Sequence, residues 1–396
     1  MQRASRFVVP QDPLFSPSAL VLRSGLQENR GAVYLDFFWA RNAIFHGLGA
    51  LGIEAGQKVL VPAYLCKAAI EPIEHFGAEV GFYAIRRNCE PDWADFESKI
   101  HGVRAAMAVH YFGIPCDIER FRAICRRYGV FLIEDCAHVL DGIPNQYRLG
   151  EFGDFSIFSP RKYLPIFDGG RLRLSEGTRN FEVRTQFESP VFTARAAKNL
   201  FDRRRAPAGL PEAKLPLNPG GGEGDGGASG GLDFGRPRKP RYVFPNELSF
   251  LPWMVNFPMS RLSRCLLPHF PLLDIASKRR ANYQWLVEKL AGLKEVRPVC
   301  RQLAGDVVPW VLPVTVGETN DAHKSLRTLG IPAVTWGEVR DQRISASEFP
   351  DADFLYEHLI FLPVHQDLES GHLEVIAEAV ASVCHAGPLN LPNLRS

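Results

Sequence analysis

One lysine of this sequence stands where an amine could react. Lys162 follows a short apolar run, Phe155 to Phe158, which is typical of a buried strand, and Gly169 and Gly170 close the turn after it. Burial lowers the pKa of a lysine, which makes its amine a candidate for a Schiff base with a carbonyl group. The alternative is a solvated lysine in a surface loop, which is the commoner case. The hypothesis therefore needs partner groups from elsewhere in the chain.

A carboxylate and an imidazole follow a second apolar run. In V-F-L-I-E-D-C-A-H, four apolar residues lead directly into Glu134 and Asp135, and His138 lies three residues further on. A carboxylate at the end of a buried strand is partly desolvated and needs a cationic or hydrogen-bonding partner. An ordinary helix N-cap is the alternative explanation for Asp135. We prefer a functional site, because capping does not require an imidazole beside the same pocket.

A predicted helix that begins near Ala40 offers a site for an anion. Apolar and small residues recur at helical spacing after Ala40, and Gly52 closes the helix. Its first turn, Ala40 to Asn42, presents free backbone N–H groups and the positive end of the helix dipole. Arg41 adds a guanidinium, which suits a phosphate group. A solvated arginine at a helix start explains this segment equally well.

Alternating strands and helices must position these groups. Strands are predicted at 58–62, 80–85, 105–110, 130–133 and 155–158, and helices at 67–76 and 118–128, while 33–38 is a mostly apolar segment that precedes the first helix. Strands that alternate with helices of about ten residues predict an α/β fold with a mainly parallel sheet and helices on both faces. Ligands of such sheets gather at the carboxyl ends of the strands, where Asp135 and Lys162 are both placed.

Composition narrows the class of protein. The 46 basic and 44 acidic residues are nearly balanced, which argues against a nucleic-acid partner. No stretch approaches the roughly 20 apolar residues of a membrane span, and the first residues lack the core of a signal peptide, so we expect a cytoplasmic protein. The eight cysteines are scattered singly, without a C-x-x-C pair, which predicts reduced thiols and no metal site.

The length of 396 residues predicts two domains. We expect a large domain over residues 1–262 and a small α+β domain over residues 263–396, joined by a long helix at 272–293. Residues 203–241 are rich in glycine and proline and are predicted to form a flexible surface insertion. Its G-x-G-x-x-G run is not a dinucleotide site, because no strand precedes it and no helix follows.

The predicted small domain contains strands at 307–316 and 361–365 and helices at 321–329 and 373–383. Three of its side chains could line a substrate cleft between the domains, although packing is the commoner role for each. They are Trp336, Arg340 and His365.

Taken together, these segments resemble the DegT/DnrJ/StrS family of pyridoxal-phosphate (PLP) enzymes, the nucleotide-sugar aminotransferases of fold type I. The likeness runs with gaps from about residue 35 to residue 385. Its most specific part is I-E-D-C-A-H at 133–138, followed by S-x-x-K and the glycine pair around Lys162. Further matches are the V-P pair at 61–62, H-x-x-G at 110–113 and N-F-P-M-S from Asn256.

The resemblance implies PLP as the cofactor and a role for three side chains around its ring. Asp135 would pair with the pyridinium nitrogen and keep it protonated. Lys162 would bond covalently to the cofactor and then move the proton at the reacting carbon. His138 would hydrogen-bond the 3-hydroxyl group or pack against the ring.

The resemblance also implies how the rest of the cofactor is held. Ser159 and the helix start at Ala40 to Asn42 would bind the phosphate, and Asn256 would reach it from a second subunit. A homodimer with shared active sites follows from that arrangement. The aromatic residue that many members stack on the ring aligns near Cys66, which leaves Tyr64 as its substitute.

Several positions depart from the family pattern. Ala40 and Arg41 replace a Gly-Thr pair, so a guanidinium stands in for the threonine hydroxyl. Ser159 precedes Lys162 by three residues, whereas the family spaces them by five, and Pro258 replaces an arginine. These departures indicate a divergent subgroup.

The activity that the resemblance implies is transfer of an amino group from an amino acid, expected to be glutamate, to a nucleotide-linked keto-sugar. Such an enzyme would serve surface polysaccharide or amino-sugar biosynthesis. One alternative is a PLP sugar dehydratase of the same fold, but members of that type carry histidine at the position of Lys162. The other is a catalytically silent or regulatory PLP-binding relative. The particular sugar, the carbon that is aminated and the amine donor stay open.

Overall fold

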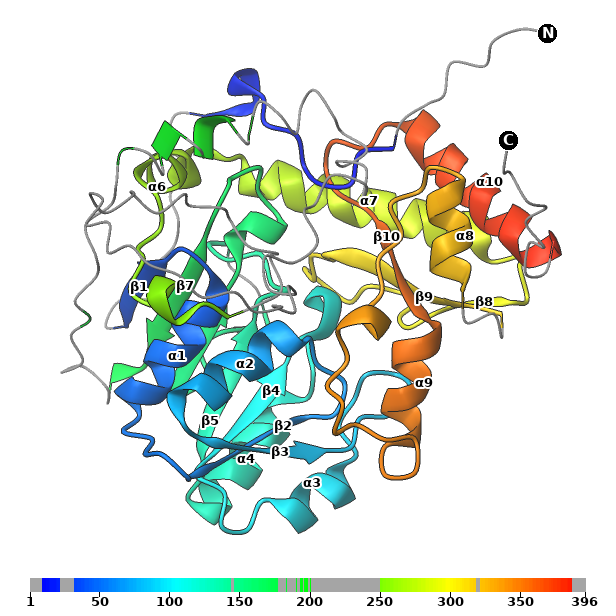
Figure 1. Cartoon of the computed structure of the whole chain (residues 1–396). Helices are drawn as coiled ribbons and strands as arrows, with labels where there is room; N and C mark the ends of the chain where they lie inside the picture. The colour runs from blue at the N-terminus through cyan, green and yellow to red at the C-terminus, as the bar shows by residue number, and fades with distance from the viewer. Residues whose placement is uncertain are drawn as a thin grey trace, which may run out of the picture.

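The computed structural model describes residues 9–21, 32–143, 146–176, 250–317 and 321–386, with 183, 190, 193–194, 196–198 and 200 between them. The predicted insertion at 203–241 lies outside the described residues. The described chain forms two sheets, of seven and three strands (Figure 1). In this part of the chain no helix is long and apolar enough to cross a membrane.

The large sheet has the strand order β1-β7-β6-β5-β4-β2-β3. Neighbouring strands are parallel from β3 to β6, and β7 runs antiparallel to both β6 and β1. The strands are β1 (Val33–Phe37), β2 (Lys58–Pro62), β3 (Glu79–Tyr83), β4 (Ala105–Val109), β5 (Phe131–Cys136), β6 (Phe155–Phe158) and β7 (Gly170–Leu174). The predicted fold class, a mainly parallel mixed sheet with helices, is confirmed.

Short connections and helix caps explain how these elements form. The helix α4 (Ile118–Tyr128) begins at Asp117, whose carboxylate accepts the N–H of Arg120, and it ends at Gly129 in the left-handed conformation. Its apolar side faces the core, while most of its other residues are charged. The strand β4, which precedes α4, is buried at every residue. This is expected for a central parallel strand when both faces of the sheet are covered.

Four further helices accompany the large sheet: α1 (Ala40–Ala50), α2 (Lys67–Phe76), α3 (Trp93–Lys99) and α6 (Arg261–Leu266). Figure 1 shows α1 and α2 side by side in front of the sheet, and these two helices pack against each other. The strand β7 and the helix α3 were not predicted. The predicted turn after Lys162 ends at Gly169, and β7 begins at Gly170, which pairs with Phe37 of β1.

The small sheet has the order β10-β9-β8 and is antiparallel. Its strands are β8 (Val296–Pro298), β9 (Val311–Val316) and β10 (Leu359–Pro363), and its helices are α8 (Ala322–Thr328), α9 (Pro350–His358) and α10 (Ser370–Ala386). The predicted strand at 307–316 begins only at Val311, since Val307 to Trp310 form a loop. The division of the chain into domains at residue 262 stays a prediction.

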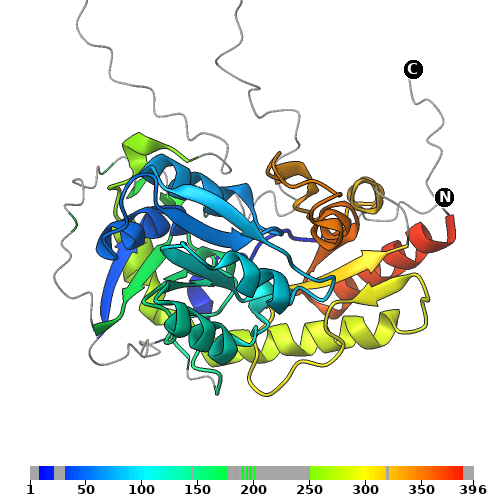
Figure 2. The same ribbon diagram turned by 90° about the horizontal axis from the view of Figure 1, so that it is seen from below.

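The long helix α7 (Leu272–Leu290) connects both parts and runs along one side of the molecule (Figure 2). Its first half packs Leu272 and Ile275 into a cluster that includes Tyr163 and Leu164, directly after the candidate lysine. Its second half buries Leu286 and other residues against β9 and β10. The helix is therefore in contact with the lysine segment at one end and with the small sheet at the other.

Candidate functional site

A cavity of about 400 Å³ opens at the carboxyl ends of β5 and β6, where ligands of parallel sheets are expected. Its volume lies within the range of small-molecule sites. It is lined by most of the residues that the sequence singled out: Ala40, Arg41, Cys66, Asp135, His138, Ser159 and Lys162. Asp135 and Lys162 therefore face one cavity, as the sequence hypothesis required.

Lys162 ends a single 3-10 turn, Pro160–Lys162, which follows β6 directly. Its backbone N–H donates to the carbonyl oxygen of Ser159 at 3.0 Å, and its Nζ lies 4.6 Å from the centre of the Trp310 ring. Burial lowers the pKa of Lys162 to about 8. Asp135 opposes this shift, while Arg161 and Arg41 add to it. At pH 7 about one such amine in ten is neutral, against about one in three thousand for an ordinary lysine.

Asp135 lies near the end of β5 and is 6% exposed. Its Oδ1 accepts the backbone N–H of Ala137 at 2.8 Å. Burial raises the pKa of this carboxyl group, while the Ala137 N–H and the nearby charge of Lys162 act in the opposite direction. A buried carboxylate with a cationic neighbour is suited to hold a proton on a ligand nitrogen.

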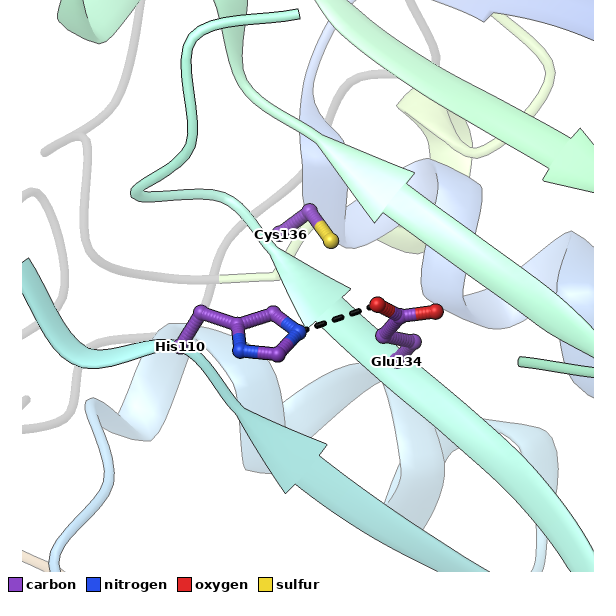
Figure 3. Close-up of side chains that lie close together, drawn as sticks. All are labelled: His110, Glu134 and Cys136. Carbon is purple, nitrogen blue, oxygen red and sulfur yellow. Dashed lines mark hydrogen bonds and ion pairs between the residues drawn. The ribbon is translucent and has the colours of Figure 1, made fainter. Parts of the chain in front are cut away.

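Glu134, the residue before Asp135, connects the end of β5 to neighbouring segments by hydrogen bonds. Glu134 accepts a hydrogen bond from Nε2 of His110 at 2.9 Å (Figure 3). It also accepts the backbone N–H groups of Gly150, Phe152 and Gly153 at 2.6–2.9 Å. Burial alone would raise the pKa of Glu134, but these hydrogen bonds hold it below its ordinary value. The carboxylate thus stays ionised and ties the loop at 150–153 to β5.

The side chains of His110, Glu134 and Cys136 lie close enough together to suggest a metal site, with all ligand atoms within 4.8 Å (Figure 3). The sequence did not reveal this cluster because His110 is 24 residues away from Glu134. Both carboxylate oxygens of Glu134 already accept N–H groups, and His110 and Glu134 are completely buried. We therefore interpret the cluster as a structural hydrogen-bond network.

His138 is held between two aromatic rings. Its imidazole stacks on Trp310, with centroids 4.3 Å apart, and on Phe112, with centroids 5.9 Å apart. The N–H of Phe112 donates to Nδ1 at 3.2 Å, so the proton of the neutral ring is on Nε2. Burial, and then the charge of Lys162, lower the pKa of His138 well below its ordinary value. A neutral imidazole that donates from Nε2 is available to the cavity.

The first turn of α1 and two positive side chains line the same cavity. Arg41 is 7% exposed, and its guanidinium lies 4.7 Å from the centre of the Trp39 ring. Gly170 allows this turn to approach β7, since a Cβ there would lie 2.1 Å from the backbone nitrogen of Ala40. Ser159 and Arg161 line the same cavity. Together these groups can bind a dianion.

Three of the predicted site residues are not among those that line the cavity. Asn42 lies in the first turn of α1, but its Nδ2 donates to the carbonyl oxygens of Met254 and Val255. Tyr64 is completely buried against Trp336, with ring centroids 5.0 Å apart. Asn256 hydrogen-bonds His46 on α1 of its own chain.

Two of the three residues predicted to line the cavity from the small domain do so. Trp336 and His365 line it, whereas Arg340 forms an ion pair with Asp353 at 2.5 Å. Sequence reasoning missed further lining residues: Gln11, Asp12, Pro13, Trp39, Arg161, Arg279 and Trp310. Arg161 and Trp39 are adjacent in sequence to predicted site residues, which could have identified them. The remainder carry no local signal, because they come from loops and a helix distant in the chain.

The fold and the site define an α/β protein with a half-buried lysine of lowered pKa and a buried carboxylate in one cavity. Residues 40–188, which include both groups, match the model of the DegT/DnrJ/EryC1/StrS aminotransferase family. The family resemblance predicted from the sequence is thereby confirmed over residues 40–188, which supply about half of the residues that line the cavity.

Curated relatives match about a third of this chain. The chain is 37% identical over 119 residues to GDP-perosamine synthase from Vibrio cholerae, which is 30% of this chain and 32% of that protein. It is 31% identical over 140 residues to UDP-N-acetyl-3-dehydro-alpha-D-glucosamine 3-aminotransferase from Acidithiobacillus ferrooxidans, covering 33% of this chain and 36% of the relative. The matches thus span about a third of the length of these relatives.

Solved structures match almost the whole chain. PseC from Helicobacter pylori, an aminotransferase of pseudoaminic acid biosynthesis, has a TM-score of 0.63 at 17% identity, covering 96% of this chain and 100% of that one. The putative sugar aminotransferase Spr1654 from Streptococcus pneumoniae, in its PLP form, has a TM-score of 0.62 at 16% identity, covering 96% and 99%. At these identities the likeness shows a shared fold.

Proposed function

We propose that this protein is a PLP-dependent aminotransferase that moves an amino group from an amino acid to a nucleotide-linked keto-sugar. One observation carries the proposal: Lys162, with a pKa of about 8, and the buried carboxylate of Asp135 line the same cavity. The donor set fits PLP, because the cofactor presents an aldehyde, a ring nitrogen, a 3-oxygen and a phosphate. When bound, PLP supplies an electron sink for charge developing at the substrate carbon.

Lys162 would supply the amine that bonds to the cofactor aldehyde. Its lowered pKa makes the nucleophilic, neutral form accessible near neutral pH. Once a substrate amine has replaced it, the same Nζ can accept and return a proton at the reacting carbon. Proton transfer of this kind contributes roughly 10²–10⁴-fold to a rate.

Asp135 and His138 would orient the ring from two sides. The carboxylate of Asp135 would hold a proton at the ring nitrogen, which its burial and its charge favour. The Nε2–H of His138 would donate to the 3-oxygen, since Nδ1 is already occupied by the N–H of Phe112. The aromatic rings on either side of His138 keep its imidazole in that orientation.

The phosphate would bind at the N-terminal turn of α1, with Ser159 and the guanidinium of Arg41. Because Arg41 replaces the threonine hydroxyl of the family pattern, charge would compensate for the lost hydrogen bond. Cys66, which aligns near the aromatic residue of the family pattern, lines the cavity, whereas Tyr64 is completely buried and is not among the lining residues. Trp310 and Trp336 therefore supply aromatic surface in the cavity that the family pattern places elsewhere.

The names of the relatives, which specify GDP- and UDP-linked sugars, support the proposed substrate class. We propose glutamate as the amine donor and a homodimer in which Asn256 reaches the partner's phosphate site. A soluble enzyme of cytoplasmic amino-sugar or surface-polysaccharide biosynthesis is the setting that these assignments suggest.

The test begins with purified protein and added PLP. Borohydride reduction should fix the cofactor on Lys162, as located by peptide mass spectrometry, and Lys162→Arg should abolish it. Lys289→Arg is the matched control, because Lys289 also lies near an aromatic ring, that of Trp285, but is exposed. Labelling elsewhere, or equal labelling of Lys162→Arg, would refute the lysine assignment.

The second stage separates an aminotransferase from its alternatives. Glutamate should convert the bound cofactor to its amine form, and a panel of nucleotide-linked keto-sugars should reverse the conversion. A catalytically silent relative would bind PLP without responding to glutamate. A dehydratase would consume a sugar substrate without forming an amino-sugar.

A further inference from the structure

The helix α7 (Leu272–Leu290) places a completely buried cation, Arg279, in the wall of the cavity. Arg279 is 1% exposed, although it lies on a helix with several exposed charged residues. Its guanidinium lies 4.6 Å from the centre of the Tyr163 ring. A buried arginine is costly unless all its donors are used, so its partners indicate what it does.

The partners of Arg279 come from the two segments that form the lysine end of the cavity. On one side Nη2 donates to the carbonyl oxygens of Lys162 and Tyr163, at 3.4 and 3.3 Å. On the other, Nη1 donates to the carbonyl oxygens of Trp310 and Pro309, at 2.9 and 3.4 Å.

The remaining nitrogen of the Arg279 guanidinium, Nε, also has a hydrogen-bond partner. Its Nε donates to the Oε1 of Gln366 at 2.9 Å, and the Nε2 of Gln366 in turn donates to the carbonyl oxygen of Tyr163 at 2.9 Å. The side-chain amide therefore reinforces the same bridge. The planar guanidinium is thus fixed in one orientation between the two segments.

We propose that Arg279 is a positioning residue that fixes Lys162 relative to Trp310 and so holds the amine in the cavity. It bonds to the backbone of both residues, while their side chains meet on the cavity side with Nζ 4.6 Å from the Trp310 ring. This inference rests on the proposed function only in that Lys162 is the reactive amine.

The geometry requires arginine. One planar group with five donors reaches carbonyl oxygens in three directions, whereas a lysine offers a single point charge with fewer donors. The neighbouring Arg280 provides a contrast on the same helix. It is half-buried and donates to the carbonyl oxygens of Val307 and Ala304, in the loop before Trp310, without contacting Lys162 or Trp310 through any hydrogen bond in the described chain.

The expected consequence appears in the titration of Lys162. Burial is the largest cause of its lowered pKa, and Arg279 is not among the charges that shift it. Loss of the bridge should release the turn, admit water to the amine and move its pKa from about 8 toward the ordinary value of 10.5. A rise of one in the pKa lowers the neutral fraction at pH 7 about tenfold.

The experiment measures the amine without cofactor. Competitive acetylation of the full-length protein across pH 6–11, read by peptide mass spectrometry, gives the pKa of Lys162 in the wild type, Arg279→Met, Arg279→Lys and Arg280→Met. We expect roughly tenfold slower labelling at pH 7 in both Arg279 variants and an unchanged profile in Arg280→Met. Arg279→Lys keeps the charge, so it serves if Arg279→Met fails to fold.

A folded Arg279 variant whose Lys162 titrates as in the wild type would overturn the proposal and leave Arg279 with a purely structural role. An equal shift of the Lys162 pKa in Arg280→Met would also overturn the proposal, because any destabilisation of α7 would then produce the effect. Failure of PLP to attach to wild-type Lys162 would instead refute the proposed function, while the titration remained readable.

Discussion

Replacement of Asp135 by asparagine should lower the pKa of Lys162, which favours attachment of the cofactor, and should impair the reaction with glutamate. The amide has nearly the same shape as the carboxylate, so the variant removes a charge with little change in packing. In the wild type, the negative charge of Asp135 is the largest cause that raises the pKa of Lys162. Burial, Arg161 and Arg41 lower the same pKa. Without that charge the ammonium form loses its partner in the cavity.

The size of the effect can be worked from Coulomb's law. Two unit charges several Å apart at an effective dielectric constant near 20 interact by on the order of 1–3 kcal/mol, which corresponds to a pKa change of roughly 1–2. The pKa of Lys162 should therefore fall from about 8 to roughly 6–7 in Asp135→Asn. Its amine would be mostly neutral at pH 7.5 and would capture the cofactor aldehyde more readily.

The same variant should lose most of its response to glutamate, because asparagine cannot keep a proton on the ring nitrogen. The assay follows cofactor attachment by borohydride trapping across pH, and glutamate-driven conversion by absorbance. Asp141→Asn is the control, since Asp141 is also a partly buried aspartate but pairs with Arg171 and is not among the residues that line the cavity. An unchanged or raised pKa of Lys162 in Asp135→Asn would refute the electrostatic reasoning.

Two further outcomes concern stability. Gly170→Ala should destabilise the fold by several kcal/mol, because the added Cβ would meet the rigid backbone of Trp39 and Ala40 at 2.1 Å, whereas Gly292→Ala, with nothing within 4 Å, should be nearly neutral in urea unfolding. Equal midpoints for the two variants would contradict the packing argument. Burial lowers the pKa of His365 to about 3. As the pH falls below 6.5, the unfolded chain therefore binds a proton at this histidine before the folded chain does. The free energy of unfolding then decreases by up to about 1.4 kcal/mol per pH unit. Urea unfolding at pH 7.5 and 5.5 should show this loss, reduced in His365→Gln, and a wild type of equal stability at both values would contradict it.

Local pattern was enough to predict much of the large sheet. The helices at 67–76 and 118–128 and the strand at 155–158 have the bounds that apolar periodicity and capping residues predict. Because parallel strands bring their carboxyl ends to one edge, the order of Asp135 and Lys162 along the chain sufficed to predict that they share a cavity. The roles assigned to them stay predictions.

The tertiary structure decided what surrounds these two groups. Trp310 lies 148 positions after Lys162, and Arg279 reaches the backbone of Lys162 across 117 positions, so no spacing in the sequence relates them. Tyr64 was the expected aromatic substitute near the ring, yet it packs against Trp336 and is completely buried. Periodicity records which face of an element is apolar. Which distant side chain fills the space beside a lysine depends on how the two sheets and α7 pack, and that is settled only when the whole chain folds.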